Sequence, residues 1–112
     1  MIVLTKNFTK QEMACRHCGL CLMQDSFMNR LQGLREAFGA PIGIKSGYRC
    51  PDHNRNVGGA KKSLHVEGRA ADIWAQDLDR LFELAKEHFP VAVKGPGFIH
   101  IDDGEKRHWE YV

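Results

Sequence analysis

The sequence lacks any long apolar run, and its charges are nearly balanced. No segment approaches the roughly 20 consecutive apolar residues that cross a bilayer, and the N-terminus lacks an apolar core followed by a small-residue cleavage site. The 16 basic and 14 acidic residues give a formal net charge of +2 and are scattered along the chain. We therefore expect no membrane insertion, no nucleic-acid partner and synthesis in the cytoplasm without an export signal of its own.

Internal repeats, linkers and low-complexity segments are also missing. A chain of 112 residues can form one domain with a real core, but not a catalytic domain plus a separate targeting module. We expect residues 1–112 to form a single domain that acts as a monomer.

Cysteine is scarce and unevenly placed. Cys15, Cys18 and Cys21 lie close together, and the fourth thiol, Cys50, stands alone. A structural zinc site normally shows two separated pairs of ligands, and four cysteines permit three disulfide pairings between which the sequence cannot choose. The spacing favours ordinary thiols or a local crosslink over a second structural metal, but all three roles stay open.

The first half of the chain carries clear helix signals. Thr9 and Glu12 form a capping-box pattern that predicts a short helix. From residue 25 to residue 38 the apolar positions recur at helical spacing, with Asp25 or Ser26 as the N-cap and Gly39 as the stop. Residues 41–45 are expected to form a short strand.

The second half mixes one helix with several strands. Asp77 is placed to cap a helix, and strands are predicted at residues 70–74, 91–93 and 98–102. The dipeptide Asp103-Gly104 predicts a hairpin leading into a closing strand at residues 107–111. The pattern indicates an α+β fold in which a small antiparallel sheet is flanked by helices.

Two segments far apart in the sequence carry a set of metal ligands. His65 precedes a tight turn that Gly68 permits, and Asp72 lies in the strand that follows. His100 lies in a second strand, where alternation puts Phe98, His100 and Asp102 on one face. Two imidazoles and one carboxylate suit Zn²⁺ with one position left for water, so we expect His65, Asp72 and His100 to bind zinc.

The polar, turn-rich segment 46–59 precedes these ligands and is expected to carry function. Its Arg49 can present a planar guanidinium to a substrate carboxylate or to the oxyanion of a hydrolytic transition state. A surface salt bridge is the alternative role. The position of Arg49 just before the ligand loop favours the functional role.

These residues, taken in order, resemble the zinc D-alanyl-D-alanine carboxypeptidase and murein endopeptidase family, which shares its fold with the hedgehog signalling domain. The resemblance spans about residues 8–109 and rests on three blocks: Ser46-Gly47-Tyr48-Arg49; Ser63-x-His65-x-x-Gly68-x-Ala70-x-Asp72; and Phe98-x-His100-x-Asp102. It implies the same three zinc ligands and Arg49 as a substrate or oxyanion contact, and it places Ser46, Tyr48 and Ser63 beside the substrate. The implied substrates are stem or crosslink peptides of peptidoglycan.

The catalytic base does not carry over from the family. Several branches place a glutamate three residues before the last histidine ligand, or a second histidine two residues before it, and here those positions are Gly97 and Phe98. Asp102 is the first candidate for a proton shuttle because it shares a face with His100; the alternative is that it orients a ligand histidine. His108 or His53 can serve instead if the fold brings either one close.

The sequence therefore predicts a zinc metallopeptidase that hydrolyses a peptide bond of the bacterial cell wall, with a phage lysis or virion protein as one possible source. Two other classes stay open: a zinc-containing module that binds wall peptides or a protein partner without cleaving them, and a structural component such as part of a phage tail tip.

Overall fold

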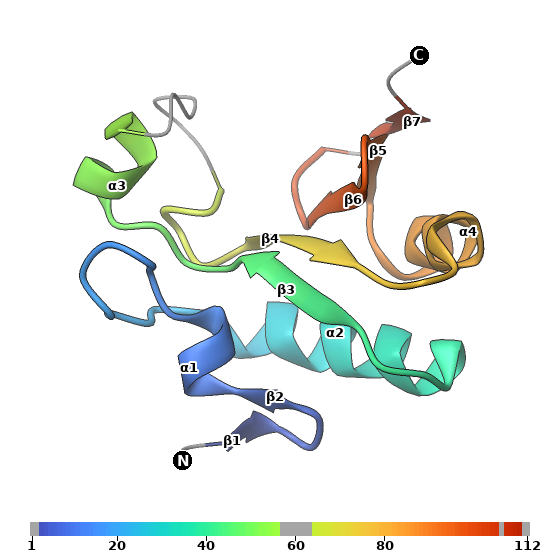
Figure 1. Ribbon diagram of the computed structural model, residues 1–112, viewed down its shortest axis with the longest axis horizontal. Helices are drawn as coiled ribbons and strands as arrows, with labels where there is room; N and C mark the ends of the chain where they lie inside the picture. The colour runs from blue at the N-terminus through green and yellow to red at the C-terminus, as the bar shows by residue number, and fades with distance from the viewer. Residues whose placement is uncertain (1–2, 57–63, 106, 111–112) are drawn as a thin grey trace.

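A computed structural model describes residues 3–56, 64–105 and 107–110 and shows an α+β arrangement (Figure 1). The N-terminal part contains a two-stranded antiparallel pair, β1 (Val3–Thr5) and β2 (Phe8–Thr9), followed by the short helix α1 (Lys10–Met13). The predicted capping box is present: the Thr9 hydroxyl accepts a hydrogen bond from the Glu12 N–H, and the Glu12 carboxylate accepts one from the Thr9 N–H. These paired bonds satisfy backbone donors that the first helical turn would otherwise leave open.

The long helix α2 (Asp25–Phe38) has the predicted bounds. Its N-cap is Gln24, without a side-chain cap, so the prediction of Asp25 or Ser26 as the N-cap is wrong. The Gln24 N–H instead donates to the Gly68 carbonyl, which anchors the start of the helix to the ligand loop, residues 64–69, which carries His65. Gly39 ends the helix in the left-handed conformation, as predicted. The second long helix, α4 (Leu78–His88), is capped by Asp77, whose carboxylate accepts a hydrogen bond from the Arg80 N–H.

A five-stranded sheet has the order β3-β4-β6-β5-β7. Its members are β3 (Gly43–Ser46), β4 (Ala70–Trp74), β5 (Val91–Gly95), β6 (Phe98–Asp102) and β7 (Arg107–Glu110), and the short helix α3 (Pro51–Asn56) follows β3. All pairs are antiparallel except β5 with β7, which is parallel. The predicted hairpin at Asp103-Gly104 is therefore wrong. Both edges of β6 are already taken by β4 and β5, so β7 must pair elsewhere.

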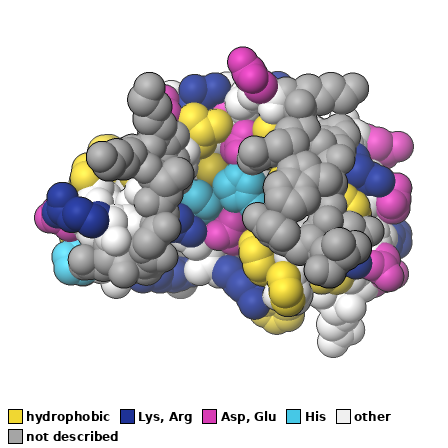
Figure 2. All heavy atoms as spheres, turned by 90° about the horizontal axis from the view of Figure 1, so that it is seen from above, with side chains coloured by type: hydrophobic (Ala, Val, Ile, Leu, Met, Phe, Trp, Pro, Cys, Tyr) yellow, Lys and Arg dark blue, Asp and Glu magenta, His cyan; other side chains and the backbone are white. Residues whose placement is uncertain are grey.

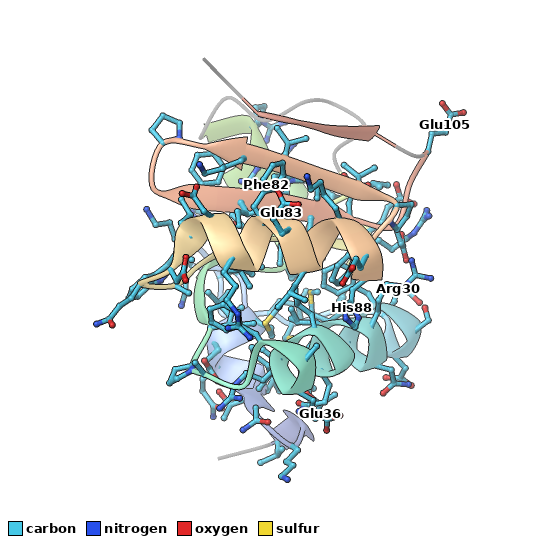
Figure 3. All side chains as sticks on the ribbon, turned by 90° about the vertical axis from the view of Figure 1, so that its right-hand side faces the viewer. Arg30, Glu36, Phe82, Glu83, His88 and Glu105 are labelled. Atoms are coloured by element: carbon cyan, nitrogen blue, oxygen red, sulfur yellow. The ribbon has the colours of Figure 1, made fainter. Side chains whose placement is uncertain are left out.

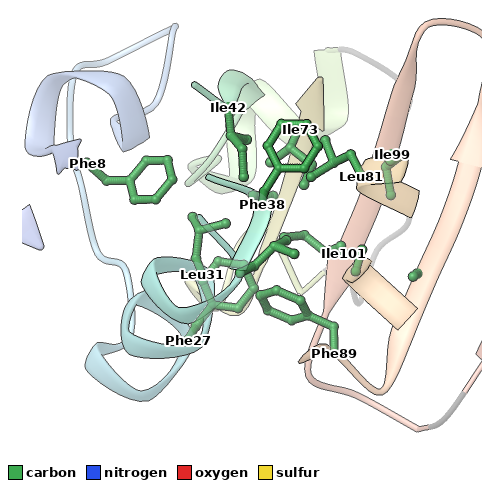
Figure 4. Close-up of a cluster of buried hydrophobic side chains, with 14 of the residues drawn as sticks. Phe8, Phe27, Leu31, Phe38, Ile42, Ile73, Leu81, Phe89, Ile99 and Ile101 are labelled. Carbon is green, nitrogen blue, oxygen red and sulfur yellow. The ribbon is translucent and has the colours of Figure 1, made fainter. Parts of the chain in front are cut away.

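The core lies between one face of this sheet and the helices α2 and α4, which pack against each other (Figures 3 and 4). Strand alternation sends Ile73, Ile99 and Ile101 into it, where each is fully buried. They meet Phe27 and Leu31 of α2, and the Phe27 and Phe89 rings lie 5.3 Å apart. Because every second residue of β4 and β6 serves this core, the residues between them must face the opposite side of the sheet. In the part of the chain that the structure describes, no helix is long and apolar enough to span a bilayer.

Gly68 provides a test of how tightly the ligand loop is packed. Its φ of +71° is unfavourable for other residues, and a Cβ added there would lie 1.8 Å from the Leu22 carbonyl oxygen. Gly39 has a similar φ of +70° but has open space around it. We expect Gly68→Ala to lower the free energy of unfolding by at least about 2 kcal/mol, from backbone strain plus overpacking. Gly39→Ala should cost only about 1 kcal/mol. Urea denaturation compares the two variants, and equal losses would show that the Leu22 contact yields easily.

Candidate metal centre

The side chains of His65, Asp72 and His100 converge on the face of the sheet that looks away from the helices. One donor atom from each lies within 4.8 Å of the others. Asp72 and His100 are direct partners in the register of β4 and β6, and His65 comes from the turn before β4. Figure 2 shows histidine and acidic side chains side by side near the middle of this face. The three residues expected to bind metal are thus brought together by strand pairing and one tight turn.

Hydrogen bonds fix which nitrogen of each imidazole faces the shared centre. His65 Nδ1 lies 2.8 Å from the Gly47 carbonyl oxygen, which can only accept, so this nitrogen donates to it and Nε2 faces Asp72. His100 Nε2 lies 2.6 Å from an Asp102 carboxylate oxygen, and its Nδ1 faces Asp72 at 2.9 Å. Each ring thus has an acceptor for a proton on its outer nitrogen, so the inner nitrogen could be freed to bind a cation.

The donor spacing fits a small tetrahedral cation. Metal–ligand distances of about 2.0–2.1 Å place neighbouring donors about 3.3 Å apart. One Asp72 carboxylate oxygen lies 3.4 Å from His65 Nε2 and 2.9 Å from His100 Nδ1. Two nitrogens and one oxygen at these separations are the donor set that Zn²⁺ accepts with its fourth position left over.

The charges around the centre reinforce one another. Burial would raise the pKa of Asp72, but hydrogen bonds and charge from His100 and His65 hold it well below its usual range. Burial likewise opposes the charged form of His100, whereas hydrogen bonds and charge from Asp102 and Asp72 raise its pKa to about 9. Without a cation, His100 would thus hold a proton between two carboxylates, and a metal ion must displace that proton to bind.

Arg49 lies against the other oxygen of Asp72. Its guanidinium donates to Asp72 Oδ2 at 3.2 Å, to the Ser46 hydroxyl at 3.1 Å and to the Asn54 side-chain oxygen at 3.3 Å. These three contacts hold the planar group at the edge of the centre, and its side chain keeps 16% of its exposure. Two of its five N–H donors remain beyond these three bonds and can meet an incoming anion.

The other predicted site residues fall into three groups. Ser46 lies at the site, where it positions Arg49. Tyr48 is only 4% exposed, which argues against direct contact with a substrate. Ser63 and the side chains of His53 and His108 lie outside the described residues. In the backbone register, His108 pairs with Ala92 of β5, whereas His100 pairs with the next residue of β5, Val93.

Asp102 has both carboxylate oxygens engaged. One lies beside His100 Nε2, and the other accepts a hydrogen bond from the Gly104 N–H at 2.9 Å. The residue is 5% exposed. Sequence reasoning missed Asn54, a buried partner of Arg49, and the Gly47 carbonyl that orients His65; neither carries a pattern that separates it from ordinary loop residues.

Two imidazoles and one carboxylate gathered on one sheet face of an α+β fold form a candidate mononuclear metal centre. The chain belongs to the peptidase M15 family, whose sequence model matches residues 5–102. It is 37% identical over 91 residues to the zinc D-Ala-D-Ala carboxypeptidase of Streptomyces albus G, covering 73% of this chain and 36% of that protein. It is also 37% identical over 91 residues to the peptidoglycan L,D-endopeptidase MepK of Escherichia coli K12, covering 71% of this chain and 49% of that protein. The chain thus spans half or less of the length of these relatives.

The ligand set can be tested by metal content. We expect purified His65→Ala to lose the zinc of this centre, because the two remaining donors come from one strand pair and close only one side of the ion. His88→Ala, on helix α4, is the matched control and should keep it. Elemental analysis after gel filtration measures both variants. Unchanged zinc in His65→Ala would count against the assignment.

Proposed function

We propose that this chain forms one zinc peptidase domain that hydrolyses peptide bonds in the stem or crosslink peptides of bacterial peptidoglycan. The observation that carries the proposal is the convergence of His65, Asp72 and His100 beside the constrained guanidinium of Arg49. The names of the two relatives support both the metal and the polymer. Because one is a carboxypeptidase and the other an L,D-endopeptidase, the proposal extends to the class of substrate and not to one particular bond.

The protein side chains divide the work around the reacting carbonyl. Bound Zn²⁺ supplies Lewis acidity and lowers the pKa of a coordinated water to about 7. Asp72 and the two imidazoles would hold the cation, and the Gly47 carbonyl and the Asp102 carboxylate fix the orientation of the two rings. Arg49 has N–H donors left over and lies within hydrogen-bonding distance of the ligand carboxylate, where it can stabilise negative charge on the substrate.

We infer that Asp102 orients His100 and does not transfer the proton. A carboxylate that accepts from His100 on one oxygen and from Gly104 on the other, and is buried, has little capacity left to reach a substrate. The family positions for a base are occupied by Gly97 and Phe98, which carry no titratable group. This leaves a specific alternative: a metal-bearing module that binds wall peptides or a protein partner without cleaving them.

The place of action follows from the substrate. We propose that the domain works at the bacterial cell wall, reached from the host cytoplasm or delivered by a phage. All three metal ligands belong to one chain, which supports a monomer as the active unit.

The hydrolytic activity can be tested with defined muropeptides and intact sacculi. We expect cleavage that stops with a chelator and returns with Zn²⁺, and mass spectrometry of the products identifies the bond. Tight binding of the same muropeptides without any product would favour the binding module. A fall in thermal midpoint with chelator, with neither binding nor cleavage, would favour a purely structural metal.

Replacing Arg49 tests its role in the transition state. We expect Arg49→Ala to lower kcat about 100-fold or more, as loss of an oxyanion donor does in other hydrolases. Arg49→Lys should recover only part of that loss, because an ammonium group cannot reproduce three fixed bonds of a planar guanidinium. Arg30→Ala, an exposed arginine on α2 (Figure 3), is the control. Unchanged kcat in Arg49→Ala would remove Arg49 from the mechanism.

Asp102→Asn separates orientation from proton transfer. The amide oxygen can still accept from His100, so we expect activity or zinc affinity to fall about 10–100-fold while the shape of the pH–rate profile stays the same. If Asp102 instead carries the proton, one limb of the profile disappears. The measurement is kcat/KM across the pH range at saturating zinc.

A further inference from the structure

A second group of potential metal ligands lies outside the proposed peptidase centre. The Sγ atoms of Cys15, Cys18 and Cys50 all lie within 4.8 Å of one another, although Cys50 is 35 residues from Cys15 along the chain. None of the cysteines forms a disulfide. Thiolates at tetrahedral positions and a Zn–S distance of about 2.3 Å place their sulfurs about 3.8 Å apart, so a small contraction of this group would let all three bind one ion.

The backbone between Cys15 and Cys18 is already folded as a metal-binding turn requires. The Gly19 N–H donates to the Cys15 carbonyl at 2.9 Å, and the Cys15 N–H donates to the Leu20 carbonyl at 2.7 Å. Gly19, with φ of +76°, supplies the left-handed residue that closes this loop. The two-residue spacing brings the Cys18 thiol back over the Cys15 thiol, which is the ligand spacing common in zinc sites.

The surroundings of Cys15 favour the thiolate, which is the form that binds metal. Cys15 is 2% exposed, and the Cys50 N–H donates to its Sγ at 3.4 Å. Backbone groups of Cys18 and His17 also donate hydrogen bonds to this sulfur. Donors that converge on a buried sulfur stabilise negative charge there.

Three thiols in one group are a poor arrangement for a disulfide. A disulfide between any two of them would leave the third thiol reduced beside it. Cys21 does not belong to this group, since its side chain packs against the hydrophobic core. Along the sequence, His53 follows Cys50 at the same two-residue spacing that separates Cys15 from Cys18.

We propose that Cys15, Cys18 and Cys50 bind a second Zn²⁺ through three thiolates, with the fourth position filled by a nitrogen ligand or water. This thiolate centre is structural and does not depend on the proposed peptidase activity. It joins the turn after α1 to the start of α3, two segments that no other covalent link connects in the described chain.

The thiolate centre would stabilise the loop that carries Arg49. Arg49 directly precedes Cys50, and its backbone N–H donates to the His65 carbonyl at 3.1 Å. On the other side of the loop, the Tyr48 N–H donates to the Met13 carbonyl at 2.8 Å, and Gly47 lies so close to Met13 that a Cβ would meet its backbone at 2.6 Å. A metal tie at Cys50 thus holds the short segment from which Arg49 and the Gly47 carbonyl reach the peptidase centre.

Metal stoichiometry and cobalt spectroscopy test the proposal on the full chain. We expect about two zinc ions per purified chain, falling to about one in Cys18→Ser and in Cys50→Ser, since losing one thiolate opens a closed site. Cys21→Ser is the matched control and should keep two. His65→Ala should also keep one, which separates this centre from the peptidase centre.

Replacement of zinc by Co²⁺ gives a readout that does not depend on activity or on any variant folding well. Thiolate ligands produce a sulfur-to-cobalt charge-transfer band in the near ultraviolet, and a centre of two histidines and one aspartate does not. We expect this band in the unmutated chain, in Cys21→Ser and in His65→Ala, and its loss in Cys18→Ser. One zinc per unmutated chain, no charge-transfer band, or a disulfide found by mass spectrometry of alkylated protein would each overturn the proposal.

Discussion

The described site depends on the contacts that the Asp72 carboxylate makes with His65, His100 and Arg49. One oxygen faces His65 and His100, and the other accepts from Arg49, so a single side chain connects the proposed metal ligands to the predicted anion contact. Burial would raise its pKa, but hydrogen bonds and charge from His100 and His65 hold it well below its usual range, which favours the carboxylate form. A carboxylate on an internal strand can be supported in this way only because the opposite face of that strand is sealed by Ile73 and the core.

Much of the fold could be predicted from local signals. The capping box at Thr9, the apolar spacing of α2 and the Asp77 cap of α4 each depend on residues within one or two turns, and each is confirmed. The partner of β7 could not be predicted, because Asp103-Gly104 has the sequence of a hairpin turn while the sheet has no free edge beside β6. Strand order is a property of the whole sheet, which turn chemistry alone does not encode.

The site shows the same division. The types and spacing of His65, Asp72 and His100 were enough to predict a common centre, and strand pairing brings them together. The groups that hold these side chains in place could not be predicted. The Gly47 carbonyl orients the His65 ring, and Asn54, in helix α3, accepts a hydrogen bond from Arg49. Likewise, Tyr48 was expected beside the substrate, whereas the loop buries it near the thiols. Such supporting roles arise from tertiary contacts that no short motif specifies.

The direct pairing of Asp72 with His100 has a consequence for how the sheet assembles. A slip of β4 by one residue against β6 would turn Asp72 toward the hydrophobic interior, expose Ile73 in its place and leave His100 without its partner on the opposite face. A cation bound by both side chains would therefore stabilise only one register of the two strands. A bound ion would in this way help to select the native register of the sheet.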